Sequence, residues 1–365
     1  MRKAMLTVAV VLAMMAGSTT APSAVSLVPT RVGPTFTSIG PLSFGPNGVL
    51  YAADRQAASI VALELGAGPA GVPGTKDVPA IDQKIAAMLG TAANEITITD
   101  LAVHPTTHNS YLSVMRGTGA AAQPTLVRVD GAGQIDVVSM DAMKFTSITL
   151  PNPAAVSTTG RGGRMQSVTQ MAYLDGNLYV TGLSNEEFAS KFWAVPYPFQ
   201  TANNGTSVEI WHGQHAAFET RSPIMAFVPT TIANVPTLIA GYTCTPLVRF
   251  PVSDLRPGGK VMGTTIAELG AGNQPIDMML YNKDGKQYLL MANTRHGVLK
   301  IATDGFGTAP AIKEPVRTGT AGPAAEKIAS MPGVVQLSLL NGTHSIALQR
   351  AAAGDPVNLQ AFPLQ

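Results

Sequence analysis

The chain has 365 residues, of which 45% are hydrophobic and only 13% are charged, with 36 Gly and 27 Pro. A charged share of about half the usual value excludes a charged disordered chain and a long coiled coil. Abundant Gly and Pro favour many short strands joined by turns. At about 150 residues per domain, the length allows two domains or one large one.

The N-terminus has the three parts of a secretory signal peptide over residues 1–24. A basic start is followed by an apolar run over residues 4–17 and by small residues up to Ala24. The run is too short for a stable membrane span, which needs about 20 residues. We predict cleavage, one mature domain over residues 25–365 without a membrane span, and a periplasmic or secreted location. A retained N-terminal anchor is the alternative.

Charge and cysteine content exclude further classes. Removal of Arg2 and Lys3 leaves 22 acidic residues and as many basic ones. No cluster of five Lys or Arg occurs, so we do not expect nucleic acid as a partner. Cys244 is the only cysteine, which excludes an intramolecular disulfide, and we expect its thiol to be buried and inert.

One pattern recurs six times along the chain: an apolar strand, a turn, a second strand, a loop and a third strand. Asp175-Gly176 and Asp284-Gly285 are strong hairpin signals between the first two strands of two copies. Anchor residues 53 to 70 positions apart mark the copies: Phe44, Val103, Tyr173, Phe227, Leu280 and Leu339.

Regularly repeated antiparallel meanders without a helical period between them are typical of a β-propeller. We predict an all-β propeller of six blades, with room for a seventh between residues 130 and 166. Apolar residues at helical spacing predict one short helical insertion near residues 80–90, between the first two blades. We expect residues 25–37 to supply an outer strand that closes the ring against the last blade. A two-sheet sandwich would not need six copies of one hairpin.

In each antiparallel blade, the first strand begins at the end where the second strand stops. The loops at these ends should gather on one face, around the mouth of the central channel, and they carry many of the chain's polar residues, Asp54 among them. The predicted ligand-binding residues at this mouth are Arg55, Arg116, Gln170, Arg221, Cys244, Asn293, Arg295 and His296.

Oxygen donors at the same mouth suggest a hard cation, Ca²⁺ or another divalent metal, which takes six or more oxygens. The predicted metal ligands are Asp100, Asn185, Glu186, Glu187 and Asp277. In the alternative interpretation these carboxylates pair with the arginines of the mouth: Arg116, Arg221 and Arg295.

The spacing of His212 and His215 can bind a transition metal, with His296 approaching from the mouth. In the alternative interpretation His212 packs near Trp211. A quinone-cofactor oxidoreductase is disfavoured, because the two tryptophans, Trp193 and Trp211, form no docking repeat.

The segment 42–54, Leu-Ser-Phe-Gly-Pro-Asn-Gly-Val-Leu-Tyr-Ala-Ala-Asp, resembles the blade motif of NHL, SMP-30/gluconolactonase and YVTN-type β-propellers, and the segment 275–301 is similar. The resemblance implies the fold, since such propellers include lactonases, lyases, scaffolds and binding modules. SMP-30-like lactonases use a divalent metal to polarise the lactone carbonyl. This sequence departs from that family where Ser38-Ile39-Gly40 stands in place of a glutamate at the first innermost strand.

Two functions therefore stay open. The first is an exported propeller that binds a small ligand, an ion or another exported protein at its polar mouth. The alternative is a divalent-metal-dependent hydrolase or lyase of the SMP-30/lactonase type.

Overall fold

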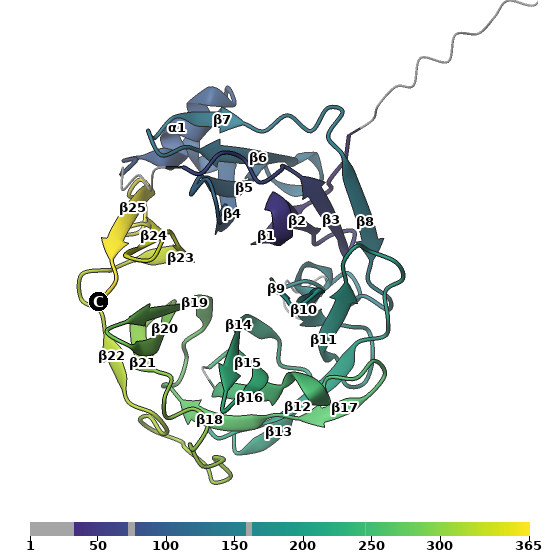
Figure 1. Ribbon diagram of the computed structural model, residues 1–365, viewed down its shortest axis with the longest axis vertical. Coiled ribbons are helices and arrows are strands. Elements are labelled where there is room, and N and C mark those ends of the chain that lie inside the picture. Colours follow the sequence, from purple (N-terminus) through teal and green to yellow (C-terminus); the bar gives the residue numbers. More distant parts are fainter. Residues whose placement is uncertain (1–32, 72–76, 158–162, 245) are drawn as a thin grey trace, which may run out of the picture.

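A computed structural model of the protein describes residues 33–71, 77–157, 163–244 and 246–365. Six β-sheets are arranged in a ring around a central axis, so the predicted six-blade β-propeller is confirmed (Figure 1). The predicted signal peptide, residues 1–24, lies outside the described residues. None of the described helices is long and apolar enough to cross a membrane.

We number the blades by the chain order of their innermost strands. Blade 1 contains β1 (Ile39–Phe44), β2 (Val49–Asp54), β3 (Ser59–Glu64) and β8 (Phe145–Thr149). Blade 2 contains β4 (Ile96–Val103), β5 (Ser110–Arg116), β6 (Gln123–Val129) and β7 (Ile135–Val137). Blade 3 contains β9 (Gln170–Leu174), β10 (Asn177–Leu183), β11 (Ser190–Pro196), β12 (Thr206–His212) and β13 (Ala217–Glu219), and β17 (Lys260–Met262) runs parallel to β12.

Blade 4 contains β14 (Ile224–Ile232), β15 (Val235–Tyr242), β16 (Pro246–Pro251) and β18 (Thr264–Glu268). Blade 5 contains β19 (Pro275–Lys283), β20 (Lys286–Asn293), β21 (Gly297–Ala302) and β22 (Ala325–Lys327). Blade 6 contains β23 (Val334–Leu339), β24 (His344–Gln349) and β25 (Asn358–Pro363). The helices are α1 (Ile81–Met88) and the short 3-10 turns η1 (Pro46–Gly48), η2 (Ala93–Glu95), η3 (Gly119–Ala121), η4 (Arg164–Gln166) and η5 (Val252–Asp254).

Each of the six predicted hairpins forms the two innermost strands of a blade. The second strand of blade 1, β2, is buried along its whole length because neighbouring blades cover both of its faces. Its apolar run Val-Leu-Tyr-Ala-Ala suits a strand buried on both sides. Apolar clusters fill the spaces between neighbouring blades and form the core.

The order of the blades around the ring differs from their order in the chain. Blade 1 lies between blades 2 and 3. On one side, Tyr51 of β2 packs with Trp193 of blade 3. On its other side, Leu63 of β3 packs with Leu126 of blade 2. The ring therefore runs 2-1-3-4-5-6, as the innermost strands β4, β1, β9, β14, β19 and β23 show in Figure 1.

The connection through β8 explains this order. After completing blade 2, the chain returns to blade 1, where Ile148 of β8 pairs with Ile60 of β3, and then enters blade 3. The segment 130–166 therefore adds the outer strands β7 and β8 in its described part, and the room left there for a seventh blade is not used.

The helix predicted near residues 80–90 is confirmed as α1, and it fills the space between blades 2 and 6. Just before it, Val78 forms an antiparallel bridge with Leu359 of β25 and so extends the last blade. The expectation that residues 25–37 close the ring against blade 6 is wrong for its described part. There Phe36 packs into the apolar cluster between blades 1 and 2.

Candidate functional site

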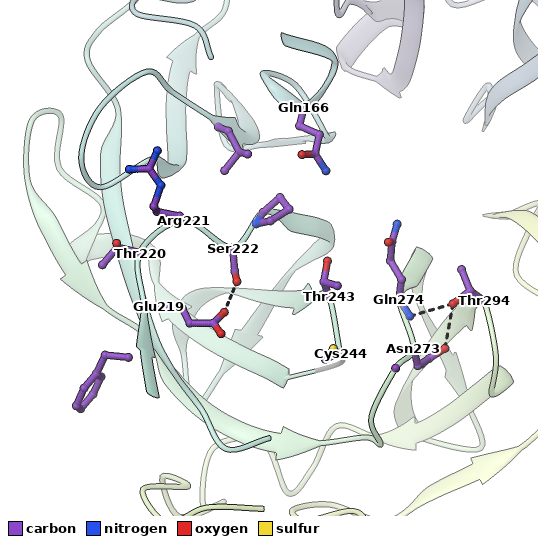
Figure 2. A pocket seen from close by; sticks show the side chains of 14 residues that line it. Gln166, Glu219, Thr220, Arg221, Ser222, Thr243, Cys244, Asn273, Gln274 and Thr294 are labelled. Carbon is purple, nitrogen blue, oxygen red and sulfur yellow. Dashed lines mark hydrogen bonds between the residues drawn. The ribbon is translucent and has the colours of Figure 1, made fainter. Parts of the chain in front are cut away.

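The starts of the innermost strands and the loops after the second strands lie on one face, which we call the loop face. This face contains a large cavity with both polar and apolar groups in its wall. This cavity, here called the basin, has a volume of about 840 Å³ and spans blades 3, 4 and 5 (Figure 2). The residues that line it are Gln166, Leu183, Phe218, Glu219, Thr220, Arg221, Ser222, Pro223, Thr243, Cys244, Gly272, Asn273, Gln274 and Thr294.

Loops from three blades supply the basin wall. Gln166 ends η4 ahead of β9, the residues 219–223 lead into β14, and the residues 272–274 lead into β19. Thr243 and Cys244 come from the β15–β16 turn. Figure 2 shows Thr243 and Gln274 on the side of the basin that faces Gln166. Of the predicted ligand-binding residues, Arg221 and Cys244 line this cavity. Cys244 is partly exposed there, so the expectation of a buried thiol is wrong.

Asn273, which is 2% exposed, organises one side of the basin. Its Oδ1 accepts a hydrogen bond from the backbone N of Arg295 at 2.9 Å, and its Nδ2 donates to Oδ1 of Asn293 at 3.0 Å. The Asn293 amide also donates to the carbonyl of Gly297 at 3.2 Å. Two of the predicted ligand-binding residues, Asn293 and Arg295, therefore belong to one hydrogen-bonded loop. His296 follows them, and its backbone N is directed at Oδ1 of Asn273.

Glu219 lies in the basin wall beside two histidines. Its Oε1 is 3.0 Å from Nδ1 of His212 and 2.5 Å from Nδ1 of His215, and Oε2 accepts from the Ser222 hydroxyl. Burial favours the neutral acid, but the contacts with His212, Ser222 and His215 outweigh it and lower the pKa of Glu219 to about 2. The His212 ring packs against that of His215, with centroids 4.0 Å apart and ring planes tilted by 40°, where the sequence suggested packing near Trp211.

Two of the predicted metal ligands, Asp100 and Asp277, lie directly after β-bulges in β4 and β19 and line the central channel. Oδ2 of Asp100 accepts a hydrogen bond from the backbone N of Leu42 at 2.6 Å, and Oδ2 of Asp277 accepts one from Leu337 at 3.1 Å. Each carboxyl thus bonds the innermost strand of the next blade, in the same direction around the ring. Gln170 reaches across the channel and donates to Oδ1 of Asp277 at 3.4 Å.

The proton affinities of this pair follow from their burial. Burial raises the pKa of Asp100 to about 7, although neighbouring backbone amides and Arg55 lower it. Burial and the charge of Asp100 raise the pKa of Asp277 well above its usual range. Arg55 lies near Asp100 and packs closely against Gly40, where a Cβ would lie 2.7 Å from Cδ of Arg55.

The remaining predicted metal ligands lie apart from this pair. Glu186 pairs with Lys191 at 2.9 Å, and the carbonyl of Glu187 accepts from Nη1 of Arg221 at 3.3 Å. The backbone N of Asn185 donates to the carbonyl of Asn152, which follows β8, at 2.8 Å. The structure therefore does not bring the five residues together.

The alternative pairing with arginines also differs from what is found. The carboxyls of Asp100 and Asp277 take backbone amides as partners, and Arg116 contacts Gln123 in its own blade at 3.5 Å. Within the described residues, one group of at least three His, Cys, Asp or Glu side chains has metal-binding spacing. It consists of His212, His215 and Cys244.

The raised pKa of Asp100 makes stability depend on pH. A carboxyl whose pKa rises from about 4 in the unfolded chain contributes fully below that pH and loses its contribution as the pH rises through about 7. We expect the free energy of unfolding to fall by on the order of 2 kcal/mol between about pH 5 and about pH 8, and to fall less in Asp100→Asn. Guanidinium denaturation measures both slopes. Asp284→Asn, in the exposed β19–β20 turn, should show the same pH dependence of stability as the wild type. If Asp100→Asn also shows that pH dependence, the raised pKa of Asp100 is contradicted.

Fold and site together define a six-blade β-propeller with a basin on its loop face. No protein-family profile matches the chain, and no curated protein matches it. The PQQ-bound aldose sugar dehydrogenase of Streptomyces coelicolor is similar in structure, with 14% identity over 92% of this chain and 96% of that chain and a TM-score of 0.33.

Two further solved structures are similar at comparable levels. A putative oxidoreductase (glucose dehydrogenase) of Thermus thermophilus has 14% identity over 91% of this chain and 98% of that chain, with a TM-score of 0.32. The β-propeller domain of Cps50 from Myceliophteria thermophila has 9% identity over 90% of this chain and 84% of that chain, with a TM-score of 0.39. None of these similarities shows a family for the chain.

Proposed function

We propose that this protein is an exported binding propeller that takes a small, hydroxyl-rich ligand into the basin. The chemistry of the basin wall is the observation that carries the proposal. Amide and hydroxyl groups both donate and accept hydrogen bonds, so several of them around one cavity suit a ligand with many hydroxyls. The neutral polar side chains of the wall are Gln166, Thr220, Ser222, Thr243, Asn273, Gln274 and Thr294. Export is proposed from the signal-peptide pattern of residues 1–24.

The partners of the acidic side chains favour binding over hydrolysis. A general base must reach a substrate proton, and a hard-metal site needs carboxylates that converge. Glu219 is held by Ser222 and the histidines, Glu186 by Lys191, and Asp277 by the next blade. The resemblance of the blade motif to SMP-30-type propellers supports the fold, and lactone chemistry is not part of this proposal.

A ligand panel tests the proposal. The wild type is screened by thermal shift against neutral monosaccharides, disaccharides and polyols, with dicarboxylates and nucleoside phosphates as chemically different sets. A ligand at about 100 times its Kd stabilises the folded protein by about 2.7 kcal/mol. We expect neutral hydroxyl-rich compounds to raise the melting temperature more than the charged sets.

Matched variants locate the binding. Gln274→Leu and Thr243→Val each remove hydrogen-bonding groups from the basin and should weaken the best ligand about 10-fold, which corresponds to about 1.4 kcal/mol. Gln134→Leu makes the same exchange in the exposed β6–β7 turn and should bind like the wild type. A panel without a stabilising neutral compound, or one whose best ligand binds all three variants equally, would overturn the proposal.

A further inference from the structure

The end of β12 and the turn after it hold two imidazoles together. His212 is the last residue of β12, and the backbone N of Gly213 donates to Oε1 of Glu268 at 2.6 Å, which fixes the start of the turn. The chain then folds back so that the ring of His215 lies 4.0 Å from that of His212, centroid to centroid. Blades 3 and 4 thus position the pair jointly, since Glu268 ends β18 of blade 4.

The buried ring of His212 has polar atoms whose hydrogen-bonding capacity is not satisfied. The residue is 0% exposed, and neither ring nitrogen makes an aligned hydrogen bond within the described residues. Nδ1 lies 3.0 Å from Oε1 of Glu219, so Nε2 is the ring atom that lacks a partner among the described residues. A buried polar group without a partner costs about 1–3 kcal/mol, and such groups point to a bound ion or water.

A thiol from the neighbouring blade completes the cluster. The backbone N of Cys244 donates to the carbonyl of Asn273 at 2.7 Å, and this bond fixes the β15–β16 turn beside the histidines. One donor atom each from His212, His215 and Cys244 lies within 4.8 Å of the others. Bonds of about 2.0 Å to nitrogen and about 2.3 Å to sulfur place the donors of one zinc ion roughly 3–4 Å apart. Small side-chain rotations therefore bring these donors onto one ion.

We propose that His212, His215 and Cys244 bind one Zn²⁺ ion in the wall of the basin. Imidazole and thiolate ligands select borderline-soft transition metals over Ca²⁺ and Mg²⁺. Binding forms two Zn–N bonds and one Zn–S bond, and the thiol proton leaves to solvent. Glu219, beside both rings, orients them as carboxylates beside metal-bound histidines do, and three protein ligands leave a fourth position for water. The proposal does not depend on the hydroxyl-rich ligand.

The full-length folded protein, freed of metal and then of chelator, is titrated with Zn²⁺ in competition with a chromophoric chelator. We expect one Zn²⁺ per chain. Loss of an outer-shell partner typically costs 10–100-fold in affinity, so removal of a ligand in Cys244→Ser or His215→Ala should cost at least about 100-fold. His344→Ala, which removes a half-buried histidine from blade 6, should keep wild-type affinity.

Two readouts on the wild type do not depend on how the variants fold. Co²⁺ should give a thiolate-to-metal charge-transfer band, and Zn²⁺, but not Mg²⁺, should protect Cys244 from alkylation. A wild type without stoichiometric Zn²⁺ binding, a Co²⁺ spectrum without the thiolate band, or unchanged alkylation would overturn the site. Full affinity in Cys244→Ser would likewise overturn the three-ligand assignment.

Discussion

Replacement of Asp277 by Ala should lower the free energy of unfolding by roughly 2–6 kcal/mol. The side chain is 5% exposed and accepts hydrogen bonds from the backbone N of Leu337 at 3.1 Å and of Met278 at 2.8 Å. Removing the carboxyl leaves two buried N–H groups without a partner, each costing about 1–3 kcal/mol, and frees Gln170 in the channel. Chemical denaturation at neutral pH measures the loss.

Two further variants separate the lost hydrogen bonds from a general effect of removing a carboxyl. Asp277→Asn keeps an amide oxygen as acceptor and should lose less stability than Asp277→Ala. Asp304→Ala removes an exposed carboxyl from the loop after β21, in the same blade as Asp277. It should change the free energy of unfolding by no more than about 0.5 kcal/mol. If Asp277→Ala is no less stable than Asp304→Ala, the carboxyl does not link blades 5 and 6.

Truncation of Ile85 to Ala in α1 should cost about 2–5 kcal/mol of the free energy of unfolding. Ile85 is 0% exposed and packs in the cluster that joins blades 2 and 6, together with Leu112 and Leu359. Because α1 fills the space between blades 2 and 6, the loss of packing should also speed amide exchange in β25 of blade 6. Denaturation and hydrogen exchange measure the two effects.

The same helix supplies the control for this prediction. Met88 is 40% exposed, so Met88→Ala should cost little and leave exchange in β25 unchanged. Equal effects of Ile85→Ala and Met88→Ala would contradict the position of α1 between blades 2 and 6.

Local structure was predictable from the sequence because its causes are local. Asp175-Gly176 and Asp284-Gly285 adopt positive φ at both residues, as tight hairpin turns require, and they form the turns between innermost strands that the sequence predicts. The helix near residues 80–90 follows from its apolar spacing in the same way.

The ring order was not predictable, because it depends on which sheet a later strand joins. In β8, Ile148 is the one buried residue, so the strand carries little apolar pattern, and its pairing with β3 is what places blade 1 beside blade 3. The closing contact of Val78 with Leu359 joins residues that are far apart in the chain, and no local signal marks it.

The sequence predicted on which face of the propeller the site lies, but not how its side chains are arranged there. Antiparallel strands gather the entry loops, and Arg221 and Cys244 do line one cavity there. The role of Asp100 depends on a β-bulge that exposes the Leu42 amide in the next blade, which spacing does not reveal. The His-x-x-His signal was visible, but its third partner comes from a loop of another blade.

The most direct test of the binding proposal is hydrogen exchange with and without the panel compound that stabilises the wild type most. We expect protection at the three basin loops, residues 219–223, 243–244 and 272–274, and little change at the hairpin turns on the opposite face. Protection centred on those opposite turns, or on the central channel instead of the basin, would contradict it.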